Sequence, residues 1–151
     1  MKRFNLLTGE LDTEHSREGF GWHAARLGDK LGSERIGGTL YELADDQQTF
    51  PYHFHHGVEE WLYVVRGSPT LRTPDGERTL GPGDVLCFRS GADGAHSVRG
   101  PGRVLIMSAN RAPSIAVYPD SDKLGIRPGP SGDPDRLDFR RGDAVGYWEG
   151  E

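Results

Sequence analysis

The sequence predicts an all-β domain of the sandwich or barrel type. Glycine makes up 22 of the 151 residues, about twice its usual share of ~7%, and ten prolines accompany it. Tight turns need these two residues, so the composition is typical of a chain with many short strands. Between residues 37 and 118, apolar runs are separated by turn signals about every 8–12 residues, the spacing of sandwiches and barrels.

Each expected strand is a short apolar or alternating run that ends at such a turn. A short amphipathic helix is the alternative for residues 20–27, but two nearby glycines count against it. Residues 73–76 read Thr-Pro-Asp-Gly, which is a hairpin turn between two strands. The expected strands are residues 20–27, 39–43, 49–55, 61–66, 70–73, 77–80, 85–88, 95–99, 103–108 and 115–118.

Composition divides the chain into three parts. Residues 1–36 are an N-terminal extension with one expected strand, and residues 37–118 are the barrel. Residues 119–151 form a C-terminal loop and tail; the first part, 119–136, is rich in proline, glycine and aspartate and predicts a long loop. The tail carries three aromatic residues, which we expect to pack on the barrel or on a partner subunit; they are Phe139, Tyr147 and Trp148.

Charge and hydropathy exclude several classes of protein. The chain has 18 basic and 23 acidic residues, a net charge of −5, which argues against nucleic acid as a partner. The longest apolar run has five residues, 61–65, too short for a transmembrane helix, and the start lacks the apolar core of a secretory signal. The single cysteine, Cys87, allows no intrachain disulfide and suits a reducing compartment. We expect a cytoplasmic protein without a membrane partner, with the Cys87 thiol in the core.

Histidines gather at one place in the chain. His53 and His55 are two residues apart in an expected strand, so both point to one face while His56 points to the other. After a turn, Glu60 shares a face with the apolar side chains of the next strand, and a carboxylate there is costly to bury unless a cation pairs with it. Glu59 is the alternative if the turn is one residue shorter.

A His-x-His pair in a strand is more often exposed, or a hydrogen-bonded pair in a core, than a metal site. The carboxylate that follows strengthens the case for a metal. His96 is a fourth candidate, although by itself it is an ordinary histidine. Arg89 is a candidate for binding an anionic substrate, but an exposed arginine at a strand end is the simpler interpretation.

These residues resemble the first motif of the cupin superfamily, G(X)5HXH(X)3–4E(X)6G. His53, His55, Glu60 and Gly67 follow one another with the spacing of that motif. Its leading glycine is absent, and residues 46–47 (Asp-Gln) stand where it would fall.

The second cupin motif, G(X)5PXG(X)2H(X)3N, is matched less closely. Gly83 and Gly91 keep its spacing. Arg89 replaces the proline, two extra residues precede His96, and Gly100 replaces the asparagine. The two motifs occur in order and span about half of the chain, which looks like a small single-domain bacterial cupin of the conserved-barrel type.

The resemblance implies a double-stranded β-helix, the jelly-roll barrel of cupins. It also implies one metal ion held by His53, His55, Glu60 and His96, and a homodimer. Three imidazoles and one carboxylate suit a divalent transition metal: Fe, Mn, Ni, Co, Cu or Zn.

Two functions follow from this resemblance. The first is a metal-dependent enzyme that acts on a small oxygenated molecule, as a dioxygenase, an isomerase or a lyase. The second is a non-catalytic cupin that binds or senses a small molecule and keeps a structural metal. Sequence does not identify catalytic residues and leaves open whether the protein is an enzyme.

Overall fold

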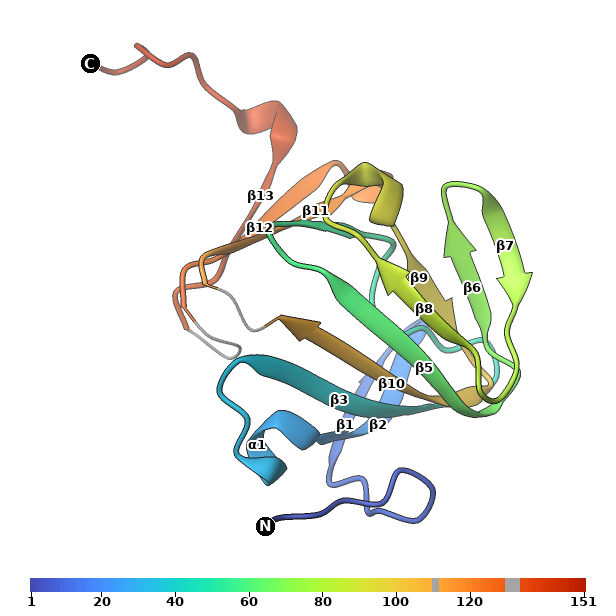
Figure 1. Ribbon diagram of the computed structural model, residues 1–151. Coiled ribbons are helices and arrows are strands. Elements are labelled where there is room, and N and C mark those ends of the chain that lie inside the picture. Colours follow the sequence, from blue (N-terminus) through green and yellow to red (C-terminus); the bar gives the residue numbers. More distant parts are fainter. Residues whose placement is uncertain (110–111, 130–133) are drawn as a thin grey trace.

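A computed structural model describes residues 1–109, 112–129 and 134–151, and these residues form thirteen strands in three antiparallel sheets (Figure 1). The largest sheet has, in spatial order, β1 (Thr13–Arg17), β2 (Phe20–Arg26), β3 (Ile36–Leu43), β10 (Gly102–Ala109), β5 (Glu60–Gly67) and β8 (Val85–Phe88). The second has β13 (Leu137–Arg140), β12 (Lys123–Arg127), β11 (Ser114–Tyr118) and β4 (Phe54–His56). The third has β7 (Gly76–Thr79), β6 (Thr70–Thr73) and β9 (Ser97–Arg99).

The helical elements are short and connect the strands. They are α1 (Leu27–Leu31) and the 3₁₀ turns η1 (Ala92–Gly94), η2 (Pro119–Ser121) and η3 (Arg141–Asp143). None of the helices among the described residues has the length and apolar character that crossing a membrane requires.

The main core lies between the large sheet and the smaller sheets. Leu62 and Val64 of β5 are fully buried there against Leu71 of β6 and Val98 of β9. The neighbouring Trp61 points to the opposite face and is 44% exposed. This alternation confirms that Glu60, two residues before Leu62, shares the inner face of the sheet.

The outer face of the large sheet is also apolar, and the N-terminal segment covers part of it. Leu40 and Leu105 are buried there, and Phe4, Leu6 and Leu11 pack against their cluster. Arg103 fixes this segment, because its guanidinium donates to the carbonyl oxygens of Leu6 and Leu7 at 3.1 and 2.9 Å.

Most strands lie where the sequence predicts them, but the C-terminal part differs. β12 lies inside residues 119–136, where we predicted a loop, because it pairs in register with β11 on one side and β13 on the other. Such long-range pairing overrides a local composition of proline and glycine. Residues 130–133 of the predicted loop lie outside the described residues. Strand β1 was not predicted either, and it pairs with β2.

The aromatic tail extends away from the sheets (Figure 1). Tyr147 and Trp148 are 86% and 78% exposed, and the centroids of their rings are 4.8 Å apart. Phe139, on the edge strand β13, is 41% exposed. Phe139 therefore belongs to the sheet through the pairing of β13 with β12, whereas Tyr147 and Trp148 are exposed. Packing of the tail on a partner subunit stays a prediction.

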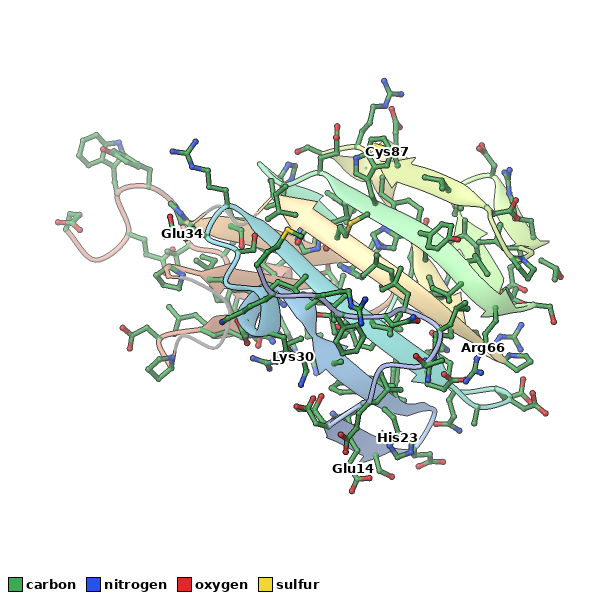
Figure 2. All side chains as sticks on the ribbon, turned by 60° about the horizontal axis from the view of Figure 1, so that its bottom comes forward. Glu14, His23, Lys30, Glu34, Arg66 and Cys87 are labelled. Atoms are coloured by element: carbon green, nitrogen blue, oxygen red, sulfur yellow. The ribbon has the colours of Figure 1, made fainter. Side chains whose placement is uncertain are left out.

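Cys87 is exposed, so the expectation of a core thiol is wrong. Alternation along β8 buries Phe88 and turns Cys87 outward, where it lies opposite Trp61 on the outer face of the sheet. Figure 2 shows Cys87 at the surface of this edge strand.

Candidate metal centre and its cavity

Strand β4 directs His55 toward the interior, and His53 comes directly before this strand. The strand pairs with β11, with His55 opposite Ala116, and this pairing continues the inner sheet surface. His53 and His55 are 6% and 8% exposed, whereas His56 is exposed. The predicted alternation of the three histidines is thus confirmed.

The loop before His96 is hydrogen-bonded to the segment around His53 and His55, and this brings His96 to the same place. The backbone N–H groups of His53 and His96 donate to each other's carbonyl oxygens at 3.1 and 2.8 Å. The preceding loop is anchored to β4, because the Gly91 N–H donates to the His55 carbonyl at 2.8 Å. The 3₁₀ turn η1 accommodates the two extra residues, so the longer loop still delivers His96.

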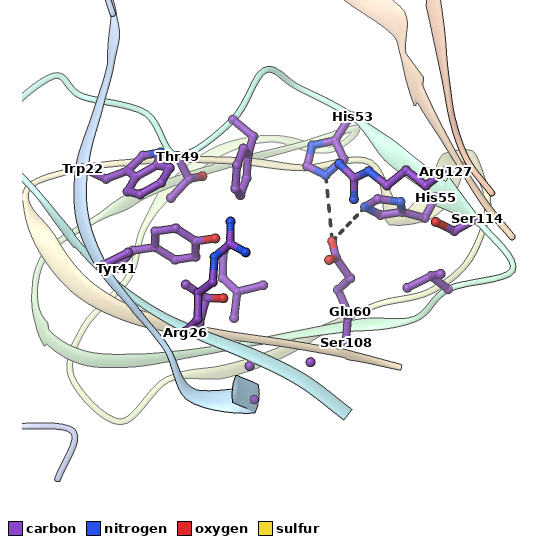
Figure 3. Close-up of a pocket in the computed structure, with 18 of the residues that line it drawn as sticks. Trp22, Arg26, Tyr41, Thr49, His53, His55, Glu60, Ser108, Ser114 and Arg127 are labelled. Atoms are coloured by element: carbon purple, nitrogen blue, oxygen red, sulfur yellow. Dashed lines mark ion pairs between the residues drawn. The ribbon is translucent and has the colours of Figure 1, made fainter. Parts of the chain in front are cut away.

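The three imidazoles converge on one carboxylate oxygen, and Figure 3 shows two of them, His53 and His55, facing Glu60. Oε2 of Glu60 lies 3.9 Å from Nε2 of His53, 3.2 Å from Nε2 of His55 and 3.3 Å from Nε2 of His96. The structure brings together all four residues that the sequence singled out. That they bind a metal stays a prediction.

Backbone contacts orient two of the rings. Nδ1 of His53 lies 2.8 Å from the Pro51 carbonyl oxygen, and Nδ1 of His96 lies 2.9 Å from that of Gly94. A carbonyl oxygen only accepts, so each Nδ1 carries a proton, and each Nε2 is the atom that faces Glu60. Nδ1 of His55 is buried without a hydrogen-bond partner among the described residues.

Ring stacking restricts the same two histidines further. The Phe88 ring lies parallel to His96 with centroids 3.7 Å apart, and the Tyr118 ring stacks on His53 at 5.8 Å. Locked rings of this kind preorganise a ligand site.

The ionisation states of Glu60 and His53 favour a bound cation between them. Burial opposes ionisation of Glu60, but hydrogen bonds and charge from His55 and His96 outweigh it and hold the pKa of this carboxyl well below its usual range. Burial, with His96 and His55 nearby, lowers the pKa of His53 to about 3. Near neutral pH, Glu60 is therefore an anion and Nε2 of His53 presents a lone pair toward it. These two groups repel unless a cation lies between them.

Two of the three distances between Glu60 and the histidine nitrogens are compatible with ligands of one shared ion. Two ligands bonded to one ion at about 2.1 Å lie roughly 3.0–3.4 Å apart at octahedral or tetrahedral angles. The distances of 3.2 and 3.3 Å to His55 and His96 fall in this range, and 3.9 Å to His53 exceeds it slightly. One donor atom each from His53, Glu60 and His96 lies within 4.8 Å of the others, and His55 joins this group through its contact with Glu60. Nitrogen and oxygen donors in this ratio fit a divalent transition metal.

The cluster lies in the wall of a cavity of about 800 Å³, in the range that holds small molecules. Sequence reasoning missed three of its polar residues, which Figure 3 shows beside the cluster: Arg26, Tyr41 and Arg127. Burial raises the pKa of Tyr41 to about 12, so its hydroxyl stays protonated. Arg127 lies on β12, the unpredicted strand, and no local motif distinguishes Arg26 from other arginines.

The other sequence candidates lie outside the cluster. Glu59 is exposed and accepts a hydrogen bond from Nε1 of Trp61 at 3.1 Å, so Glu60 and not Glu59 faces the histidines. Arg89 is exposed and borders a separate, smaller pocket. His15, which was not a candidate, is exposed and lines the main cavity, where its ring stacks on Trp22 with centroids 5.3 Å apart.

Comparison with solved structures identifies similar chains. A proposed sugar phosphate isomerase from Acidithiobacillus ferrooxidans ATCC 23270 is 26% identical, with a TM-score of 0.74 over 85% of this chain and 81% of that chain. A sugar phosphate isomerase of the cupin superfamily from Silicibacter pomeroyi DSS-3 is 22% identical, with a TM-score of 0.75 over 94% of each chain. The polyketide cyclase RemF from Streptomyces resistomycificus is 27% identical, with a TM-score of 0.53 over 72% of this chain and 78% of that chain.

No curated protein matches the chain. The sequence profile of the cupin domain matches residues 39–109, which hold both histidine motifs and the strands from β3 to β10. The likeness to the Silicibacter structure confirms the jelly-roll fold. Residues 39–109 are therefore a small cupin domain.

Proposed function

We propose that this protein is a metal-dependent isomerase of a small phosphorylated sugar. The observation that carries the proposal is the convergence of three buried histidines on the partly buried Glu60 carboxylate, in the wall of a cavity large enough for such a molecule. The likeness to the Acidithiobacillus protein favours isomerisation over the oxygenase and lyase chemistries that the same fold supports.

His53, His55, Glu60 and His96 would hold the metal. A bound divalent ion would act as a Lewis acid toward the substrate's carbonyl and hydroxyl oxygens. An aldose–ketose interconversion transfers one proton between neighbouring carbons and one between their oxygens, so it needs no oxidant and no second substrate.

The chain's own side chains would orient the substrate. The Tyr41 hydroxyl stays protonated near neutral pH, since burial raises its pKa to about 12, and it can donate a hydrogen bond to a sugar oxygen. Tyr41, Phe50 and His53 form a continuous series of edge-to-face ring contacts, at 5.7 and 6.2 Å, along one wall of the cavity. This wall gives the carbon side of a sugar an apolar surface.

The test is solvent-proton exchange during turnover. Protein reconstituted with Fe, Mn, Ni, Co, Cu or Zn is incubated in D₂O with a panel of aldose and ketose phosphates. Proton NMR then follows product formation and deuterium incorporation at the carbon next to the carbonyl. We expect both with at least one metal, with loss of both in Glu60→Gln and retention in Glu59→Gln, because only Glu60 faces the histidines.

Turnover that survives Glu60→Gln would contradict the proposal, and so would consumption of dioxygen with the same substrates. Tight binding of a panel member without exchange would favour the other function, a non-catalytic cupin with a structural metal.

A further inference from the structure

We propose that Arg26 and Arg127 together form the binding site for the phosphate group of the substrate. The two arginines come from separate sheets, since Arg26 ends β2 and Arg127 ends β12. Both line the cavity that holds the histidine cluster, and Figure 3 shows both side chains extending into it. The ligand's identity rests on the proposed function, whereas the anion site itself does not.

Both guanidinium groups influence the ionisation of one residue of the cavity wall, Tyr41. Each is close enough to the Tyr41 hydroxyl to favour its ionised form, although burial outweighs them and raises the pKa of Tyr41. An anion bound in this cavity would therefore be attracted by both positive charges. Guanidinium groups offer paired N–H donors that match the oxygens of a phosphate.

Among the described residues, the two arginines lack the carboxylate partners that other arginines of this protein have. Arg136, in the same cavity, bonds Asp138 at 2.8 Å, and Arg72 bonds Asp120 at 2.6 and 2.9 Å. Within residues 1–109, 112–129 and 134–151, neither Arg26 nor Arg127 forms an ion pair with a carboxylate. No carboxylate in this part of the chain therefore neutralises their charge.

The charge of the cavity favours a dianion. Among the described residues, its lining holds five cationic side chains and three carboxylates, in a protein whose net charge is −5. Two of those carboxylates, Glu60 and Asp138, already contact the histidines and Arg136. A phosphate monoester carries nearly two negative charges near neutral pH, so it neutralises both arginines, whereas a single carboxylate neutralises one.

Calorimetric titration with inorganic phosphate tests the site. We expect Arg26→Gln and Arg127→Gln each to weaken phosphate binding about tenfold or more, since each removes a charged hydrogen-bond donor. Arg89→Gln is the matched control, because Arg89 is exposed and outside the cavity, and it should leave binding unchanged. Equal thermal midpoints for the three variants would show that they fold alike.

Two further titrations give independent readouts. In Glu60→Gln, phosphate binding should persist even if the metal and all turnover are lost, so failure of the isomerase proposal is distinguishable from failure of the anion site. Acetate, a single carboxylate, should bind at least tenfold more weakly than phosphate. The proposal is overturned if the arginine variants bind phosphate like the wild type, if Arg89→Gln weakens binding equally, if Glu60→Gln abolishes it, or if acetate binds as tightly.

Discussion

Replacing Gly94 by alanine is expected to displace His96 and weaken metal binding. A Cβ atom at this position would lie 1.8 Å from the carbonyl oxygen of Arg89, where contacts under 3.0 Å essentially never occur. The loop must therefore open by about 1.2 Å, the difference between these two distances. Because the Gly94 carbonyl accepts the Nδ1 proton of His96 at 2.9 Å, the movement is transmitted to the ring.

The size of the effect follows from how little a metal ligand can move. Bond lengths to a metal vary by about 0.2 Å, so a shift of ~1 Å removes His96 from the ligand set. Losing the support of one ligand lowers metal affinity about 10- to 100-fold. Strain in the loop should also cost about 1–3 kcal/mol of unfolding free energy, about 2–4 °C in Tm for each kcal/mol in a chain of this size.

Competition of the metal-loaded protein with a chelator measures the affinity, and thermal unfolding of the metal-free protein measures the stability. Gly81→Ala is the control, because a Cβ atom there would meet nothing within 4 Å among the described residues. If Gly94→Ala retained wild-type metal affinity, the argument that this loop positions His96 would be refuted.

The remaining predictions concern stability, reactivity and assembly. Burial opposes ionisation of Glu42, but its hydrogen bonds from Arg103 and Arg66 outweigh burial and lower its pKa. The stabilising contribution of Glu42 is therefore present above the pKa of about 4.5 that it has in the unfolded chain. It is lost as pH falls through the lower pKa of the folded protein. Glu42→Gln should remove about 1–3 kcal/mol at pH 7 and flatten the acid limb of stability against pH, as denaturant titrations at several pH values would show. Cys87 is exposed and should react with a thiol reagent without denaturant. The rate should rise with pH toward the thiol's pKa, which partial burial and Glu59 raise, because the thiolate is the reactive form. Protection of the thiol in the folded protein would contradict its exposed placement. We propose that the exposed tail contacts a second copy. Deleting residues 144–151 should then convert a homodimer to a monomer in light scattering, and a truncated protein that is still a dimer would refute this.

Local pattern was sufficient to predict most of the barrel strands and the orientation of the first three metal-ligand candidates. Alternation placed Glu60 on the same face as Leu62 and separated His53 from His56, and burial confirms both inferences. Turn chemistry predicted the hairpin between β6 and β7 at Gly76. These features depend on residues close together in sequence, which is why a single sequence can predict them.

Features that depend on distant parts of the chain were not predicted. β12 forms because β11 and β13 offer it backbone partners, although its own composition is typical of a loop. Arg127 lines the cavity through that pairing, so its place there has no local signal. Likewise, Cys87 looks apolar in sequence, and its exposure follows from the position of β8 at the edge of the sheet.

Metal content is the most direct test of the central claim, that the three histidines and Glu60 form one metal site. Wild-type protein, Glu60→Gln and Glu59→Gln are each reconstituted with Fe, Mn, Ni, Co, Cu or Zn, desalted and measured by elemental analysis. We predict about one equivalent of one of these metals in the wild type and in Glu59→Gln, and its loss in Glu60→Gln, because only Glu60 contacts the imidazoles. Equal metal content in all three proteins, or none in the wild type with any of the six metals, would contradict the account.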